Sequence, residues 1–224
     1  VPALVWLGLT QRHAAATSML AIVPTSGSGV LAYAVEGNVD WIAALLMFLG
    51  MFIGGQIGSL LLSRLPEVVL RWAFVVFMAF IIVSQLIFIP SRDSSIEFNL
   101  VTVLLMIVFG VLAGILAGLL GVGGGAICVP ALSILFGASD LIARGTSLLS
   151  MFPNAMTTTV ANVRRKMVHA KAGLIIGIVA ALTAPLGTWI AGAMSPRAGG
   201  ILFATYLTVL LIRSIWVALK VTRE

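Results

Sequence analysis

Between Gly114 and Pro130 the chain carries six glycines and a proline inside an otherwise strongly apolar run. In the hydrocarbon of a bilayer, a backbone N–H or C=O group without a partner is costly. Irregular backbone is therefore tolerated there only where protein buries it or where it lines a cavity. A glycine cluster at membrane depth indicates either close helix packing or a broken helix at a binding site.

The composition of the chain requires a membrane protein. Of its 224 residues, 61% are hydrophobic and 9% are charged, and the mean hydropathy is +1.18. A soluble domain has about a quarter of its residues charged. We therefore expect an all-α integral membrane protein, a polytopic helical bundle in which residues 1–224 form a single membrane domain. One cysteine, Cys128, excludes an internal disulfide.

Eight apolar segments predict the helices, on windows of about 20 residues. They cover residues 14–35, 41–63, 68–90, 98–120, 126–137, 145–163, 172–193 and 198–219. The segment 126–137 is too short to cross a bilayer as a straight helix at about 1.5 Å per residue. It follows the glycine cluster directly, so it is predicted to be a half-helix. Residues 1–9 form a similar short piece.

The chain contains an internal repeat. Val1-Pro2-Ala3-Leu4 recurs as Val129-Pro130-Ala131-Leu132, and after one inserted residue the match continues at an offset of 129 residues. The matched pairs are Thr17 and Thr146, Pro24 and Pro153, Val39 and Val168, Gly58 and Gly187, and Phe74 and Phe203. Internal repeats are common in secondary transporters. We assign residues 1–90 to repeat 1 and residues 98–220 to repeat 2, and we expect the first glycine-rich segment of repeat 1 to lie upstream of Val1.

Loop charges favour opposite orientations for the two repeats. If residues 98–137 cross the membrane twice, nine lysines and arginines lie on one side and three, Arg92, Arg144 and Arg197, on the other. If they cross once, the split is seven against five. Positive residues collect on the cytoplasmic side, so the first, inverted arrangement is favoured. Arg213 lies inside an apolar segment, where it either attracts anions or, as we expect, extends to the interface.

Two helices related by the repeat carry similar polar faces. Within roughly a quarter-turn of the helix, one face presents Thr146, Ser150, Asn154 and Thr157, and the other Thr17, Ala21, Thr25 and Ser28. Each helix also has a proline, which frees the carbonyl one turn earlier. Such kinked, hydroxyl-lined helices fit a central polar pathway. The alternative is that the hydroxyls bond carbonyls of their own helices and only pack the helices together.

The turn from Gly121 to Gly125 is the strongest candidate for a binding site. Successive backbone N–H groups at a helix N-terminus form a concavity that binds anions without a buried cation. Packing is the alternative, and we expect it for the ridge of Gly110, Gly114 and Gly118, which are spaced by four residues. The predicted substrate contacts are Gly121, Gly123, Gly124, Gly125, Thr146, Asn154, Thr157, Thr17, Thr25 and Ser28. The predicted kinks are at Pro24, Pro130 and Pro153.

No other chemistry is indicated by the sequence. No carboxylate falls at mid-membrane, where a proton or sodium relay would place one. No zinc-binding motif, nucleophile motif or carboxylate pair occurs, so we expect no enzyme activity, no cofactor and no metal. Basic residues sit beside membrane ends without interleaved aromatics, which argues against nucleic acid. The expected partners are a small anionic substrate and the lipid bilayer, with a homo-oligomer left open.

The motif Gly-Leu-Leu-Gly-Val-Gly-Gly-Gly-x-x-x-Val-Pro-x-Leu, followed by Gly145-Thr-Ser147 and the repeated Ala16-Thr-Ser18, resembles the TauE/SafE family of membrane permeases. The likeness covers essentially the whole chain. It implies movement of sulfite, organosulfonates or related sulfur anions across bacterial inner membranes. We therefore expect a permease for a small anion that works by rocking of one repeat against the other. The alternative is a non-transporting membrane scaffold subunit of an enzyme or sensor complex.

Overall fold

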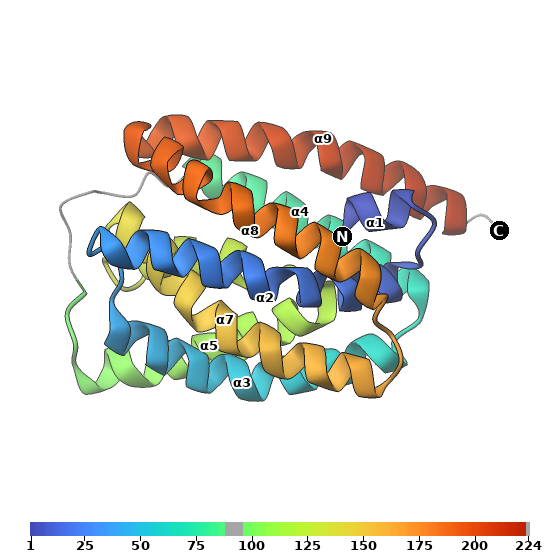
Figure 1. Ribbon diagram of the computed structural model, residues 1–224, viewed down its shortest axis with the longest axis horizontal. Helices are drawn as coiled ribbons and strands as arrows, with labels where there is room; N and C mark the ends of the chain where they lie inside the picture. Colours follow the sequence, from blue (N-terminus) through green and yellow to red (C-terminus); the bar gives the residue numbers. More distant parts are fainter. Residues whose placement is uncertain (88–95, 223–224) are drawn as a thin grey trace.

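The computed structural model describes residues 1–87 and 96–222, and its long helices run along one common axis (Figure 1). The helices are α1 (Pro2–Trp6), α2 (Gln11–Val35), α3 (Trp41–Arg64), α4 (Glu67–Ile87), α5 (Leu100–Leu120), α6 (Gly125–Ile134), α7 (Asp140–Arg164), α8 (Ala170–Ala193) and α9 (Pro196–Thr222). These residues contain no strand, so the all-α prediction is confirmed. Each predicted segment coincides with a helix, although residues 88–90 lie outside the described part.

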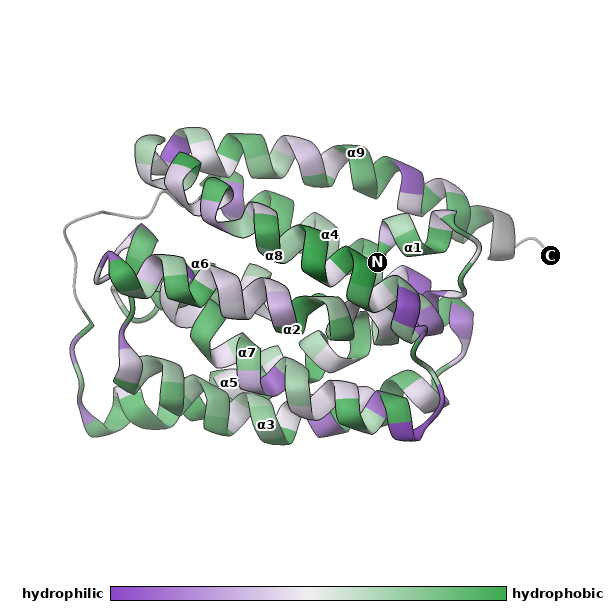
Figure 2. Ribbon diagram, viewed as in Figure 1, coloured by the Kyte–Doolittle hydropathy of each residue, from purple (hydrophilic) through white to green (hydrophobic). Residues whose placement is uncertain are grey.

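Six of the described helices are long and apolar enough to cross a membrane, namely α2, α3, α4, α5, α8 and α9. Hydrophobic residues cover the length of the bundle, and hydrophilic residues gather near its two ends (Figure 2). Large apolar side chains such as Leu182, Val209 and Trp216 are exposed on the outer helices. A bilayer accommodates such a surface, and water does not. The chain is therefore a multi-pass membrane protein.

Two helices begin three or more residues earlier than the apolar windows predict. α2 begins at Gln11 and α7 at Asp140 because hydroxyl caps precede them. The Oγ1 of Thr10 accepts the N–H of His13 (3.3 Å), and the Oγ of Ser139 accepts the N–H of Ile142 (3.4 Å). Such caps satisfy backbone donors that the helix cannot pair. Hydropathy windows miss them because capping residues are polar.

The closest helix contact joins α3 and α5, which run in parallel. A Cβ atom at Gly54 would lie 2.0 Å from the carbonyl oxygen of Val111, and one at Gly114 would lie 2.5 Å from that of Met51. The same backbone contact recurs one turn away on each side, through Gly50, Gly58, Gly110 and Gly118. Small residues four apart let membrane helices approach this closely. The predicted packing role of the Gly110–Gly118 ridge is confirmed.

The two polar helices, α2 and α7, lie side by side and run in opposite directions. A Cβ at Gly29 would lie 2.9 Å from Leu148 Cδ1, and a Cβ at Gly145 would lie 2.9 Å from Tyr33 Cβ. Positions later in α2 therefore face positions earlier in α7. An inverted repeat places its related helices in this antiparallel way. The repeat itself stays a prediction.

α2 also packs against α8, which follows α7 in the chain, and α7 packs against α3, which follows α2. Gly173 in α8 faces Leu20 in α2, with only 3.2 Å between an added Cβ and Leu20 Cβ. At the same end of the bundle, Ser59 in α3 donates a hydrogen bond to Asn162 Oδ1 in α7 (2.6 Å). The segment 1–90 and the segment 98–220 are therefore interleaved, and they do not form two separate halves.

Two matching hydrogen bonds tie these crossed pairs together. The Oγ1 of Thr17 accepts the backbone N–H of His169 (3.0 Å), and the Oγ1 of Thr146 accepts the backbone N–H of Asp40 (2.9 Å). Both acceptors are fully buried, and both donors cap the helix that follows. The two bonds are related by the offset of 129 residues found in the sequence. We refer to them as the threonine clasps.

The segment 98–137 leaves and re-enters the same end of the bundle. α5 begins beside the start of α3, and its C-terminal Gly121 contacts Ala15 near the start of α2. The chain then reverses, and α6 returns towards the start of α7, which begins at Asp140 shortly after α6 ends at Ile134. Arg144 and Arg197 therefore lie at one end, and Arg12, Arg64, Arg71, Arg164, Arg165, Lys166 and Lys171 at the other. This is the distribution expected for the two-crossing arrangement, with Arg92 and Arg223 outside the described residues.

Replacing Gly54 by alanine should destabilise the fold. The added Cβ would overlap the Val111 carbonyl, and overpacking of this kind costs about 1–3 kcal/mol. Thermal unfolding in detergent should show a lower Tm for Gly54→Ala. The matched control is Gly187→Ala, because a Cβ at Gly187 meets nothing within 4 Å and alanine is the better helix former. Equal Tm values for the two variants would contradict the α3–α5 contact.

Replacing either clasp threonine by valine should destabilise the protein to a similar extent. Valine preserves the shape but removes the acceptor for the N–H of His169 or Asp40, and the loss of one such hydrogen bond costs about 0.5–1.5 kcal/mol. Hydrogen exchange measured by mass spectrometry should show faster exchange at that amide, and Thr→Ser should restore protection. Thr205→Val is the control, since the Thr205 hydroxyl only bonds its own helix at Ile201 O. If the amide of His169 or Asp40 exchanged as slowly in the Thr→Val clasp variant as in Thr205→Val, the clasps would be ruled out.

Candidate functional site

The candidate site is the turn that joins α5 to α6. Gly121, Gly123 and Gly124 have φ values of +68°, +77° and +89°, a region of backbone space that L side chains rarely adopt. Gly121 ends α5, and Gly124 is the N-cap of α6. Three left-handed residues in four positions reverse the chain within the bundle. The glycine cluster is therefore a broken helix as well as a packing element.

Five successive backbone N–H groups in this turn have no acceptor. Within the described residues, the N–H groups from Val122 to Ala126 donate to no carbonyl or side chain, whereas those of Ile127 and Cys128 both bond Gly124 O (3.0 and 2.9 Å). The first N–H groups of any helix lack an intrahelical partner, and they carry the positive end of the helix dipole. The start of α6 therefore presents unpaired donors inside the bundle.

Neighbouring helices hold the turn tightly. A Cβ at Gly121 would lie 2.4 Å from Ala15 O in α2, and a Cβ at Gly124 would lie 2.7 Å from Met51 Cε in α3. Met151 in α7 closes on the remaining two glycines, with 2.6 Å contacts to a Cβ at Gly123 or Gly125. A side chain at Gly121 would thus clash with backbone, whereas at Gly123, Gly124 and Gly125 the flexible side chains of the neighbouring helices would have to shift. α2, α3 and α7 together form the wall behind the N–H groups.

The open side of the turn faces a cavity of about 260 Å³ between α4, α9 and the rest of the bundle. Gly121, Val122 and Ala126 line it from the turn, and Ser18 lines it from α2. The opposite wall is apolar and comes from α4 and α9, through Phe74, Phe77, Met78, Ile81, Phe203, Leu207 and Leu210. The cavity thus combines a few polar groups with an apolar lining, as small-molecule sites do.

Two further cavities extend this space towards the two ends of the bundle. One of about 180 Å³ shares Ala126 and Phe203 with the first cavity and reaches Gln85 and Arg144. The other, of about 20 Å³, shares Pro2 and Phe74 and reaches Arg71 and Arg213. Because neighbouring cavities share lining residues, they form a series from one end of the bundle to the other. We call this series the central route.

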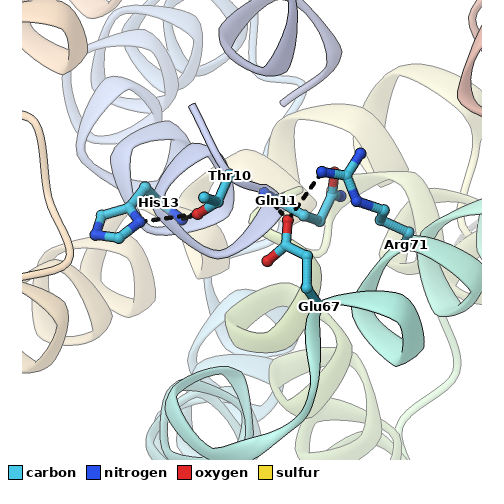
Figure 3. A network of polar contacts seen from close by, with 5 residues as sticks. All are labelled: Thr10, Gln11, His13, Glu67 and Arg71. Atoms are coloured by element: carbon cyan, nitrogen blue, oxygen red, sulfur yellow. Dashed lines mark hydrogen bonds and ion pairs between the residues drawn. The ribbon is translucent and has the colours of Figure 1, made fainter. Parts of the chain in front are cut away.

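An ion pair or stacked cation stands at each end of the central route. At one end the Nε of Arg144 bonds Asp140 Oδ1 (2.9 Å). At the other end, Figure 3 shows Glu67 accepting from both Arg71 (3.1 Å) and the backbone N–H of Gln11. Beside this cluster, Figure 3 also shows the Thr10 cap of α2 bonded to the ring of His13. The guanidinium of Arg213 stacks 3.4 Å above the Trp6 ring, an exposed position consistent with the interfacial placement expected for it.

The predicted hydroxyl and amide contacts are placed elsewhere. Thr17 and Thr146 form the clasps, and Thr25 and Thr157 bond carbonyls of their own helices at Ala21 (2.8 Å) and Asn154 (3.0 Å). The side chain of Asn154 points at Gly55 in α3, with 2.3 Å between its Oδ1 and an added Cβ. None of these side chains lines the cavities of the central route. Of the predicted glycines, Gly121 and Gly125 line cavities of the central route, whereas Gly123 and Gly124 do not.

Ser28 has a structural partner that the sequence did not suggest. Its hydroxyl donates to Ala181 O in α8 (2.7 Å), and Ala181 is four residues before Pro185. Proline removes the N–H that would otherwise bond this carbonyl, so Ser28 replaces the lost donor. α2, α6 and α7 likewise continue through Pro24, Pro130 and Pro153. These prolines do not interrupt their helices.

Several polar lining residues were missed by sequence reasoning, and three of them lie in the two larger cavities. Ser18, Gln85 and Arg144 line the central route, and only Arg144 had a signal, as a positive residue on the side that has few. Cys128 is fully buried within α6, in agreement with a packing role. No cluster of three or more metal-ligating side chains occurs in the residues that the structure describes.

Comparison with known proteins agrees with this architecture. The family described as "Sulfite exporter TauE/SafE" matches residues 1–214. Two Bacillus subtilis (strain 168) proteins are similar to the chain. "Probable membrane transporter protein YunE" is 28% identical over 204 residues, which cover 82% of this chain and 70% of that protein. "Probable membrane transporter protein YdhB" is 33% identical over 70 residues, which cover 31% of this chain and 29% of that protein. No solved structure matches the chain.

The family match covers nearly all of the chain and includes the glycine turn, α6 and both polar helices. It agrees with the described part of the structure, which is all-α and has six helices able to span a membrane. In bacteria this membrane is the inner membrane. This chain belongs to the TauE/SafE family of membrane transporters.

Proposed function

We propose that the protein moves a small anion, sulfite or an organosulfonate, along the central route. The observation that carries this proposal is the row of unpaired N–H groups from Val122 to Ala126 beside a cavity of about 260 Å³. Such donors bind an anion through the helix dipole and direct hydrogen bonds. The sulfur anion is taken from the family's name. A neutral donor set binds weakly enough to release its ligand, as transport requires.

The charges at the two ends of the bundle support one orientation. The end where α2, α4 and α8 begin carries most of the arginines and lysines, so it corresponds to the cytoplasmic side. Arg71 and Arg213 then stand at the cytoplasmic end of the central route, and Arg144 at the outer end. Arg71 and Arg144 are each paired with a carboxylate, so they offer an anion hydrogen-bond donors at the two ends, and Arg213 adds a positive charge at the cytoplasmic end.

Because the segments 1–90 and 98–220 are interleaved, alternating access by movement of a smaller part of the bundle is favoured over rocking of one repeat against the other. The clasps and the glycine contacts hold α2 to α8 and α7 to α3, so rocking of one repeat against the other would have to break all of them. α4 and α9 instead contact the rest of the bundle across the cavities of the central route. We therefore assign the movement to the α4–α9 pair, which differs from the rocking expected from sequence.

Introducing a negative charge at Ser18 tests the anion site. Ser18→Asp, introduced into the natural gene, should reduce sulfite efflux from cells by at least tenfold relative to the wild type. A carboxylate in the cavity would accept hydrogen bonds from the N–H groups and repel the anion. Ser18→Asn, with nearly the same shape and no charge, should retain most of the efflux. Both proteins should elute normally in gel filtration. Equal efflux in the two variants would refute an anion site at the turn, and no efflux from the wild type would favour a scaffold.

A cross-link between α2 and α8 tests which part moves. In the Leu20→Cys and Gly173→Cys double variant, the two Cβ positions are 3.2 Å apart, near the roughly 3.8 Å typical of a disulfide. Oxidation should join the two repeats and leave sulfite efflux close to that of the reduced protein, because α4 and α9 remain free. Each single variant is the control for oxidation. Efflux abolished by oxidation and restored by reduction would instead support rocking of the repeats.

A further inference from the structure

Arg144 has an unusual position for a positive residue. It lies near the outer end of α7, on the side that has few positive residues and where topology disfavours them. Its side chain is 29% exposed, and it lines the cavity of about 180 Å³ that also contains Gly125 and Ala126 of the turn. Arg197, on the same side, is exposed and does not line this cavity. The distribution of positive residues between the two sides of the membrane therefore does not explain the arginine at position 144.

A buried carboxylate orients the guanidinium of Arg144. Asp140 is 1% exposed and accepts from Nε at 2.9 Å. Asp140 is also the first residue of α7, where the helix dipole stabilises a negative charge. Holding an arginine through Nε leaves its two terminal nitrogens free. Within the described residues they donate no hydrogen bond, and Nη2 lies 3.4 Å from the position of an added Cβ at Gly199, which also lines the cavity.

We propose that Arg144 selects the substrate at the outer end of the central route by pairing its two terminal nitrogens with two oxygens of an oxyanion. Asp140 is its positioning residue. This inference rests on the proposed function and names the chemical class it accepts, namely sulfite, sulfonate or carboxylate groups with two accessible oxygens. The planar guanidinium fits such groups in a bidentate manner, and the ammonium of lysine does not. The anion then exchanges between Arg144 and the N–H groups of the turn.

Kinetics with defined sidedness test this role. Exchange of ³⁵S-sulfite into right-side-out vesicles that contain unlabelled sulfite gives the KM at the outer face. Loss of a charge-assisted hydrogen-bond pair should raise this KM about tenfold or more in Arg144→Gln. Arg144→Lys should fall between Gln and the wild type. The KM at the inner face, measured in inside-out vesicles, should stay within about twofold of the wild type, because Arg71 and Arg213 stand there. Arg197→Gln is the matched control and should behave as the wild type.

Asp140→Asn separates orientation from charge. If Asp140 positions Arg144, this variant should raise the outer KM while the maximal rate changes less. A merely structural ion pair would instead lower the Tm and reduce both parameters at both faces. Arg144→Cys adds a second measurement, because a cationic methanethiosulfonate reagent should restore a positive group and lower the outer KM, whereas a neutral reagent of similar size should not. Cys128 is fully buried, so it does not react.

Binding distinguishes the two ways in which the inference can fail. Sulfite should raise the Tm of the detergent-solubilised wild type and should do so much less in Arg144→Gln. If the wild type shows neither exchange nor a sulfite-dependent Tm shift, the proposed function is wrong and the role of Arg144 falls with it. If the wild type shows both and Arg144→Gln matches it in outer KM and Tm shift, only the role of Arg144 is overturned.

Discussion

Unpaired backbone N–H groups inside a membrane protein are the constraint on which the rest of this structure depends. Hydrocarbon cannot satisfy them, so the protein must surround them or supply a ligand. The turn between α5 and α6 leaves such donors at Val122 to Ala126. α2, α3 and α7 pack against its glycines, and α4 and α9 close the far side of the cavity. The arrangement of most helices follows from the need to enclose one short stretch of backbone.

Much of the fold could be predicted from the sequence because its main signals are local. Apolar segment lengths gave the membrane helices, and the short run after the glycine cluster gave the half-helix α6. Spacing by four residues indicated the packing of Gly110 and its neighbours. The helix that packs against the α5 ridge could not be predicted. Small residues spaced by four also occur on α3, at Gly50, Gly54 and Gly58, but the spacing alone does not say which two helices pair. Pairing is decided by the whole bundle.

The candidate site was predictable in its backbone and not in its side chains. Positive φ and a helix start are encoded in the glycines themselves, so the turn was visible. A threonine hydroxyl has no such signature, since it bonds a ligand, its own helix or a distant N–H with similar ease. Thr17 and Thr146 lie on the predicted polar faces, yet they bond His169 and Asp40. The offset of 129 residues does relate both bonds, so the pattern signalled a repeated contact before its partners were known.

α7 combines a central position with side chains that do not suit lipid. It is buried through polar residues such as Ser150, Asn154 and Asn162, and it is absent from the described helices apolar enough to span a bilayer. Alone in hydrocarbon, Asn162 Oδ1 would lose the hydrogen bond that it accepts from Ser59 in α3. During biogenesis α7 therefore has to enter the membrane against α2 and α3, which are already made when it leaves the ribosome. The order of helices along the chain thus serves the insertion of the least lipid-compatible one.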